Sequence, residues 1–412
     1  MSRRRTIAAA IAASAALGVA TGTTSSATAA AVPIGPGCPA LYMLGVQGTG
    51  QSSPTADPLA DTGVVGALIA PVMAAAPGLV QRSYIPYGAG FGGAVPGGGP
   101  EPYAVSVTDA RRQLDAAAVQ IAETCPSTLL AGIGYSQGAQ AMSSFARDVG
   151  SGVGPVAPER VAGIALYAHP DRAEGAPIFP GRPGQTVPDP APGTSGVAVS
   201  AVLMSNPPAG GGGIADGATS YGALAGRVAD ICTDGDLACS APDRAAVLRV
   251  GAEIAAQADL RDPLAAIGSL NGLLSAALGE AWTTLVLNDF QAGGGNIDYL
   301  PQLPLAARLV DAADPRNPAP APEEIGAAAA RWDEITAIVA ANPLGVLPKL
   351  TGQLAAAWGQ LVSDNADLVD PAVWARFADT VARHNNYAVN GQLNSGIAWM
   401  VALAHDIAGG QP

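Results

Sequence analysis

Short apolar runs alternate with longer stretches of helical periodicity through the first half of the chain. The apolar runs are rich in Val, Ile, Leu and Ala, as buried strands are, and lie at 40–46, 79–84, 129–134, 161–167 and 197–204. Between them, apolar positions recur at helical spacing over 64–75, 105–124 and 139–149. Strands that alternate with helices predict an α/β fold, in which crossover helices flank a central parallel sheet.

The segment 243–383 has a different pattern and is rich in Ala and Leu. It predicts helices at 244–257, 263–282, 322–341, 346–362 and 371–383, with a Pro-rich break at 312–322. Leu350, Leu354, Trp358 and Leu361 share one helical face. We therefore expect a core at 32–242, completed by 384–412 with a last helix at 395–407, and a helical insertion at 243–383 that packs on the sheet.

The first 31 residues have the pattern of a secretory signal. Three arginines at positions 3–5 precede a short apolar run at 7–19, and small residues then lead to a cleavage site at Ala27-Thr28-Ala29. A membrane anchor is the alternative, but the run is too short and Thr and Ser follow it. No later stretch holds the eighteen or so consecutive apolar residues of a spanning helix. We expect a mature protein that is secreted or held in the cell envelope, without a transmembrane segment.

The chain is strongly acidic. Its formal net charge is -13, which becomes -16 once the three signal arginines are removed. Phosphate backbones repel such a protein, so nucleic acid is not an expected partner.

Four cysteines, Cys38, Cys125, Cys232 and Cys239, are an even number in a chain expected to be exported, which favours two disulfides. Free or metal-bound thiols are the alternative, but neither a CxxC pair nor a nearby His cluster supports a metal. A bridge between Cys232 and Cys239 would rigidify one short loop, whereas one between Cys38 and Cys125 would span most of the first half. No metal, nucleotide or flavin cofactor is expected.

The segment Gly134-Tyr135-Ser136-Gln137-Gly138 matches the G-x-S-x-G pattern of a nucleophile elbow. Its glycines permit close backbone approach where the chain turns from strand to helix, and the turn exposes the serine hydroxyl at the sheet edge. A predicted strand directly before Ser136 and a predicted helix after it supply the context that this chemistry needs. An ordinary Gly-containing turn is the alternative.

A serine hydroxyl needs a base, and the base needs a group that orients it. His169 follows a strand and has no acid in a suitable context between it and Ser136, and His405 falls in the last predicted helix. His384 lies between two predicted helices, where a loop can present a catalytic group. We predict that His384 is the base, with a solvated surface histidine as the alternative.

The acid is expected in the loop between Cys232 and Cys239, where a disulfide would hold a carboxylate in place. Asp234 and Asp236 both qualify by their chemistry, and spacing alone does not choose between them. A solvated acidic loop is the alternative.

These residues together resemble the cutinase family, especially the cutinase-like esterases that actinobacteria secrete. The likeness covers 38–242 and resumes at His384. The family's elbow reads GYSQGA, as this chain does from Gly134, and its Cys-Pro pair before the elbow strand is matched by Cys125-Pro126. The resemblance implies a cutinase-like α/β-hydrolase fold.

The family motifs also imply roles for particular residues. A C-x-x-x-D-x-x-C loop implies Asp236 as the acid, and an H-x-x-Y pattern is matched by His384 and Tyr387. The Gly-Ser/Thr pair after the first strand implies an oxyanion hole made by Thr49 with the backbone N–H of Gln137.

Three features depart from the family pattern. The insertion separates Cys239 from His384, whereas in family members the histidine follows the last cysteine closely. Gln47 stands where an arginine is common. His169-Pro170 stands where relatives often have Asp-Pro, and we interpret His169 as structural or pocket-lining.

The resemblance implies a carboxylic ester hydrolase that forms an acyl-enzyme on Ser136. Its substrate would be a lipid ester, a polyester such as cutin, or an acylated glycolipid of the cell envelope. The insertion would act as a lid or as a groove for the acyl chain. An acyltransferase with the same triad and a non-catalytic envelope-binding protein are the alternative functions.

Overall fold

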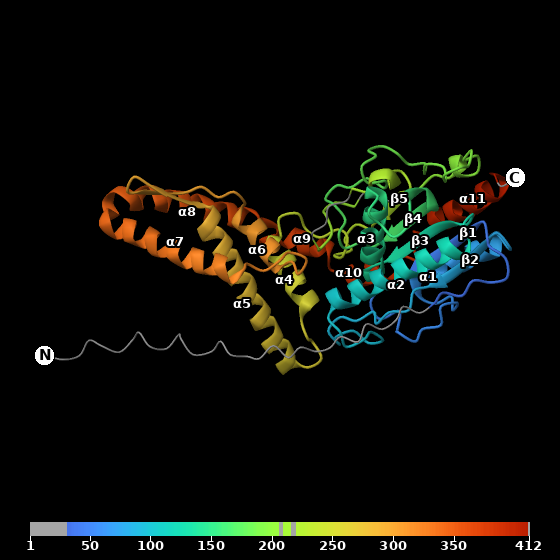
Figure 1. Ribbon diagram of the computed structural model, residues 1–412, viewed down its shortest axis with the longest axis horizontal. Coiled ribbons are helices and arrows are strands. Elements are labelled where there is room, and N and C mark those ends of the chain that lie inside the picture. Colours follow the sequence, from blue (N-terminus) through green and yellow to red (C-terminus); the bar gives the residue numbers. More distant parts are fainter. Residues whose placement is uncertain (1–30, 206–208, 216–219, 411–412) are drawn as a thin grey trace.

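The central sheet has five strands, all parallel. The computed structural model describes residues 31–205, 209–215 and 220–410, so the predicted secretory signal lies outside the described residues except for Ala31. The strands are β1 (Leu41–Val46), β2 (Val80–Tyr84), β3 (Leu129–Tyr135), β4 (Val161–Tyr167) and β5 (Val228–Ile231). Their order in the sheet is β2-β1-β3-β4-β5 (Figure 1). The predicted α/β class is confirmed.

Helices cover both faces of this sheet, which is why its strands are apolar on both sides. Along β1, Leu41 and Met43 pack into one apolar cluster, whereas Tyr42 and Leu44 pack into the other. The first cluster is closed by α1 (Gly63–Ala75) and α11 (Asn394–Gly410), and the second by α2 (Tyr103–Thr124) and α3 (Gln137–Ser151). The period-2 alternation of strand side chains thus sends alternate residues to opposite layers.

The prediction of the fifth strand at 197–204 is wrong. That segment contains a short 3-10 turn (Val199–Ala201), and the N–H groups of Ala198 and Val199 donate to the Asp406 carboxylate at 2.8 and 2.9 Å. The fifth strand is instead β5, which pairs with β4. Its sequence, VADI, escaped prediction because Asp230 interrupts the apolar run.

The segment after β5 folds into a second, helical lobe (Figure 1). Its elements are α4 (Ala246–Gln257), α5 (Pro263–Asn288), β6 (Phe290–Gly293), β7 (Asn296–Tyr299), α6 (Leu305–Ala313), α7 (Pro322–Ala341), α8 (Pro343–Ser363), α9 (Pro371–Arg376) and α10 (Thr380–Asn385). Two apolar clusters separate from those of the sheet lie inside it, one around Val286 and Ile335 and one around Ile254 and Val310. We propose that 243–383 is an insertion with its own core.

Two parts of this lobe differ from the sequence prediction. The hairpin of β6 and β7 was missed, although Gly294 and Gly295, with φ of 58° and 75°, have the conformation of a two-residue hairpin turn. The missed α6 follows it. The single helix predicted at 371–383 is broken into α9 and α10, and α10 extends through His384 to Asn385.

Two disulfides are present, as the even number of cysteines predicted. Cys38 is joined to Cys125 across 87 positions, and Cys232 to Cys239 across 7 positions. Within the described residues no cysteine is free.

We expect the two bridges to differ in their effect on the free energy of unfolding, because stabilisation grows with the length of the closed loop. The Cys38→Ser/Cys125→Ser variant should lose about 4.5 kcal/mol and the Cys232→Ser/Cys239→Ser variant about 2.5 kcal/mol on the chain-entropy model. Urea unfolding of both variants under non-reducing conditions measures the difference. Equal losses, or a larger loss from the short loop, would contradict the loop-length argument.

Candidate active site

The chain turns sharply between β3 and α3 at Ser136. This residue has φ 53° and ψ -120°, a conformation that non-glycine residues rarely adopt. A Cβ at Gly138 would lie 2.2 Å from the Val46 carbonyl oxygen, and one at Gly134 would lie 2.6 Å from the Ala139 Cα. Glycine is therefore required on both sides of the turn, and the predicted strand-turn-helix setting of Ser136 is what the structure has.

The structure brings Ser136, His384 and Asp236 together in one hydrogen-bonded series. His384 Nε2 lies 2.9 Å from Ser136 Oγ. On the other side of the ring, Nδ1 lies 2.9 and 3.0 Å from the two oxygens of Asp236. Because an ionised carboxylate only accepts hydrogen bonds, Nδ1 must donate to Asp236, which leaves Nε2 free to accept from the Ser136 hydroxyl.

The setting of His384 differs from the prediction in one respect. The residue was expected in a loop, but it occupies the last turn of the short helix α10. Tyr135, which directly precedes Ser136, donates its hydroxyl to the His384 carbonyl oxygen at 2.6 Å. This contact, which links the elbow strand to the backbone of the histidine, was not foreseen, and nothing in the sequence around Tyr135 distinguishes it from a core tyrosine.

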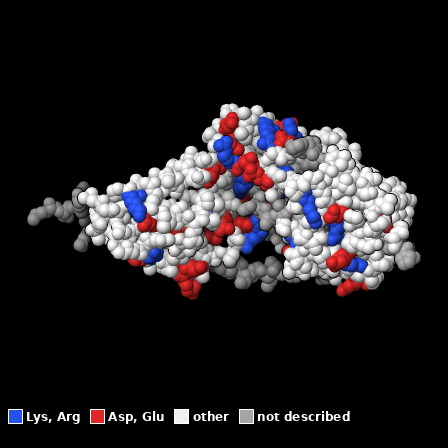
Figure 2. All heavy atoms as spheres, turned by 90° about the horizontal axis from the view of Figure 1, so that it is seen from above, with Lys and Arg blue, Asp and Glu red and all other residues white. Residues whose placement is uncertain are grey.

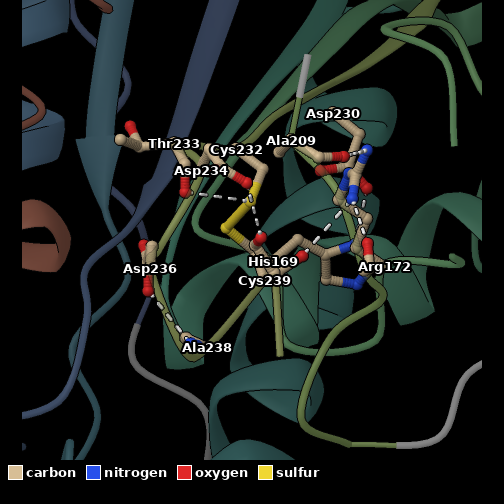
Figure 3. The surroundings of a disulfide bond; sticks show 12 residues. His169, Arg172, Ala209, Asp230, Cys232, Thr233, Asp234, Asp236, Ala238 and Cys239 are labelled. Atoms are coloured by element: carbon tan, nitrogen blue, oxygen red, sulfur yellow. Dashed lines mark hydrogen bonds and ion pairs between the residues drawn. A yellow bond between two sulfur atoms is a disulfide. The ribbon is translucent and has the colours of Figure 1, made fainter. Parts of the chain in front are cut away.

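The Cys232–Cys239 disulfide closes the loop that carries Asp236 (Figure 3). The Asp236 side chain is 1% exposed and accepts from the Ala238 N–H at 3.0 Å. Tyr387 donates its hydroxyl to Asp236 Oδ2 and accepts the Thr233 N–H, both at 2.9 Å. Burial, together with the nearby Asp236 charge, raises the pKa of the Tyr387 hydroxyl well above its ordinary range, so it stays a donor. The H-x-x-Y pattern thus corresponds to a tyrosine that positions the carboxylate.

Asp234, the other carboxylate of this loop, points away from His384. It forms an ion pair with Arg376 of α9, with Nε 3.1 Å from Oδ2, and accepts the Gly210 N–H at 3.1 Å. Although partial burial raises the pKa of Asp234, the hydrogen bonds and charge of Arg376 outweigh this effect and lower the pKa below its ordinary value. The geometry therefore separates the two candidates that spacing could not, and Asp236 is the one beside the histidine.

Thr49 and Gln137 were expected to form the oxyanion hole, and Gln137 directly follows Ser136 in the chain. Thr49 follows β1 in the chain and lines the same cavity as Ser136 and His384. Gln137 is the first residue of α3, where a helix leaves backbone N–H groups without intrahelical partners. The Gln137 side chain is buried and donates to the Gly90 carbonyl oxygen at 2.9 Å, which holds the glycine-rich loop of 88–99 against the elbow.

Gln47, which stands where relatives have arginine, has a local structural role. Its amide donates to the Thr62 carbonyl oxygen and accepts the Val65 N–H at 3.3 Å, so it holds the start of α1.

The other two histidines lie away from Ser136. His169 is fully buried, and its Nδ1 lies 2.9 Å from Asp230 Oδ2 on β5 (Figure 3). His169 does not line the cavity over Ser136, although the next residue, Pro170, does. Of the two expected roles, structural or pocket-lining, His169 therefore has the structural one. His405 is exposed on α11.

A cavity of about 1240 Å³ opens over Ser136 and His384. Core residues such as Phe91, Tyr103 and Val107 form one wall. The helical lobe also lines the cavity, with Ala252, Glu253 and Ala256 of α4 and Asp314, Pro315 and Arg316 of the α6–α7 connection. Among the described residues, no group of three or more His, Cys, Asp or Glu side chains is arranged to hold a metal ion.

Comparison with known proteins gives one family. A family model described as Cutinase matches residues 37–248, just over half of the 412-residue chain. A carboxylesterase Culp6 homolog from Corynebacterium glutamicum is 33% identical over 119 residues, which cover 29% of this chain and 37% of the relative. The chain thus matches little more than a third of that relative's length.

Solved structures that match part of the chain include an acetyl xylan esterase and a phage lysin B. The catalytic core of an acetyl xylan esterase from Trichoderma reesei is 20% identical with a TM-score of 0.31, and the match covers 57% of this chain and 99% of that one. Lysin B from Mycobacteriophage D29 is 18% identical with a TM-score of 0.32, over 73% of this chain and 90% of that one.

The lowered pKa of Asp234 makes a prediction about acid stability. A carboxyl group whose pKa is lower in the folded than in the unfolded state stabilises the fold above the unfolded value, near pH 4, and this stabilisation is lost as the pH falls through the folded pKa. Asp234→Asn should therefore lose less stability than the natural chain between pH 5 and pH 3. Arg376→Gln, which removes the cation, should reduce the loss of stability between pH 5 and pH 3 in the same way. Urea unfolding at several pH values measures the free energy of unfolding of both variants. If either variant lost as much stability between pH 5 and pH 3 as the natural chain does, the Asp234–Arg376 pair would not be the cause.

Proposed function

The chain belongs to the cutinase family and is a carboxylic ester hydrolase, and from this premise we propose that it cleaves lipid or polyester-type esters through Ser136, His384 and Asp236. The observation that carries the proposal is the unbroken series of hydrogen bonds from Ser136 Oγ through the His384 ring to Asp236. These are the contacts that a serine nucleophile, its base and the orienting acid require.

In the proposed first half-reaction, Ser136 Oγ attacks the ester carbonyl carbon while His384 Nε2 takes its proton. Charge develops on the carbonyl oxygen, and we assign its stabilisation to Thr49 and to the backbone N–H of Gln137. Collapse of the intermediate breaks the bond to the alcohol, which leaves with the proton from His384. In the second half-reaction, water gives its proton to His384 and attacks the acyl carbon, and collapse then breaks the bond to Ser136 Oγ, which takes the proton back from His384 as the acid is released.

We further propose that the helical lobe shapes the substrate site. Its α4 and the α6–α7 connection supply one wall of the cavity over Ser136. A volume of about 1240 Å³ exceeds the range of a typical small-molecule pocket, which favours a large acyl or alcohol part. The chemistry would then lie in the core and the choice of substrate in the insertion.

Export is part of the proposal. The N-terminal sequence has the pattern of a secretory signal, and two disulfides are typical of proteins that mature outside the cytoplasm.

Replacement of triad residues tests the mechanism. Ser136→Ala and His384→Ala should each lower kcat for p-nitrophenyl esters by 10³-fold or more, on the order seen when a triad member is removed. Asp236→Asn should cost on the order of 10³-fold because the histidine loses its orienting acceptor, whereas Asp234→Asn in the same loop should change kcat by less than about tenfold. Labelling by a fluorophosphonate should be abolished in the Ser136 variant and strongly slowed in the His384 variant, because the serine is a poor nucleophile without its base. A Ser136→Ala variant that retained full activity would overturn the proposal.

A second substitution tests the wall formed by the lobe. Ala256→Trp should fill part of the cavity and lower kcat/KM for long-chain p-nitrophenyl esters by about tenfold, while hydrolysis of the acetate ester stays within about twofold. Val247→Trp, at a position of α4 that is 53% exposed and outside the cavity, is the matched control. If the two variants gave the same chain-length profile, the lobe would not limit the substrate.

A further inference from the structure

Helix α5 is apolar on all sides, yet the protein buries little of it. Glu280 is its one charged residue in 26 positions. Its length and composition would suit a membrane span, but only 11% of its most apolar stretch is buried inside the protein. A helix that is apolar all round is normally surrounded by a core or by lipid.

The exposed side chains of α5 form a stripe along one face. The stripe consists of large apolar residues spaced so that they share a helical face, and comprises Leu264, Ile267, Leu274, Leu278 and Trp282. The exposed fractions of these residues are 81%, 67%, 44%, 51% and 46%. Trp282, at the end of the stripe, packs edge-to-face on Trp332 of α7 at 4.8 Å and still remains exposed. Exposed Asn271 and Ser275 lie on the same face between these residues, so the large apolar side chains form an interrupted row. A set of large exposed apolar side chains on one face is typical of an interaction site.

Other side chains of α5 pack against the protein itself. Ala277 packs in the cluster of α4 and α6, and Val286 packs in the cluster of α7 and α8. The helix can therefore lie along a lipid surface, with its stripe immersed, but cannot be surrounded by lipid.

Charge favours an uncharged partner. Helix α8 has the same pattern as α5, with Lys349 as its one charge and an exposed stripe of Leu344, Leu347, Leu354, Trp358 and Val362. In Figure 2 charged side chains gather where the two lobes meet, and few lie on the outer part of the helical lobe. With a net charge of -13, the chain is repelled by anionic headgroups, so apolar contact must supply the attraction.

The stripe begins beside the catalytic cavity. The Leu260 N–H, just before α5, donates to the Gly92 carbonyl oxygen at 2.8 Å. Gly92 follows Phe91, which lines the cavity together with Val95 and Ser136. A surface in contact with Leu264 and Ile267 would thus lie near the cavity of the core.

From these observations we infer that the stripe on α5 docks the protein on the surface of uncharged lipid. The choice of lipid rather than protein as the partner rests on the proposed function, because a lipid ester would reach the cavity from that surface.

Flotation with phosphatidylcholine vesicles tests the docking apart from catalysis. The full chain carrying Ser136→Ala should float with the vesicles, and 1 M NaCl should not release it because no ion pairs hold it. Adding Leu264→Gln, Ile267→Gln and Leu274→Gln, which keep helix propensity, should reduce the bound fraction at least tenfold. Val153→Gln/Val197→Gln, which changes two core residues that are 77% and 72% exposed, is the control and should bind as before. No flotation, or equal flotation of the triple variant, would overturn the inference.

Activity and association separate the remaining outcomes. With Ser136 intact, the triple Gln variant should hydrolyse dissolved p-nitrophenyl butyrate as the natural chain does, but an emulsified long-chain ester at least tenfold more slowly. If neither protein hydrolysed any ester, the proposed function would fail while flotation would still decide the docking. If sedimentation without lipid showed dimers that the triple variant abolished, and vesicles were not bound, a second copy would cover the stripe and the inference would be wrong.

Discussion

The backbone of Ser136 is held in a left-handed conformation by the ends of the two strands that flank β3. Its N–H donates to the Tyr167 carbonyl oxygen at the end of β4, at 2.8 Å. On the other side, Gly138 lies so close to the end of β1 that no side chain fits there. The order β1-β3-β4 in the sheet thus creates the turn that exposes the hydroxyl, and every other part of the site is arranged around that atom.

Asp236 and His384, the proposed acid and base, reach Ser136 by different routes along the chain. Asp236 follows β5 and lies in the loop that the Cys232–Cys239 disulfide closes. His384 comes back to the core only after the whole helical lobe. The C-terminal end of the lobe, α10, is tied to the loop that carries Asp236. The Leu237 N–H donates to Thr380 Oγ1 at 2.8 Å, and Arg383 donates to the Asp234 carbonyl oxygen at 2.6 Å. Because the entropy of loop closure grows slowly with length, a long insertion is tolerated once its return to the core is held in this way.

Much of the site could be predicted because its chemistry depends on local sequence. The elbow at Ser136 needs glycines at fixed positions, and the acid loop is bounded by two cysteines. The choice between Asp234 and Asp236 needed either a family motif or the structure, since both are carboxylates in one short loop. The contact of Tyr135 with the His384 backbone joins residues 249 positions apart and leaves no local signal.

The errors in the fold have similar physical causes. Strand β5 was missed because Asp230 within it is buried against His169, so a long-range polar pair hid the apolar pattern. The segment 197–204 is apolar enough for a strand, but the Asp406 carboxylate on the distant α11 takes the N–H groups that a ladder would use. In the insertion, periodicity predicted the long helices but not the short α6, and the unpredicted break between α9 and α10 lies where the lobe contacts the core.

The two lobes divide the requirements of an ester hydrolase in a way that the packing explains. The core must hold three side chains within hydrogen-bond distance, and it does so with buried strands, a disulfide and buried tyrosines. The helical lobe has separate apolar clusters, so its outer helices can change without disturbing the elbow. It nevertheless supplies one wall of the cavity, through small residues such as Ala252 and Ala256. Under the proposed function, we therefore expect substitutions in the lobe to change which esters reach Ser136 and from which surface, and substitutions in the core to change the proton transfers.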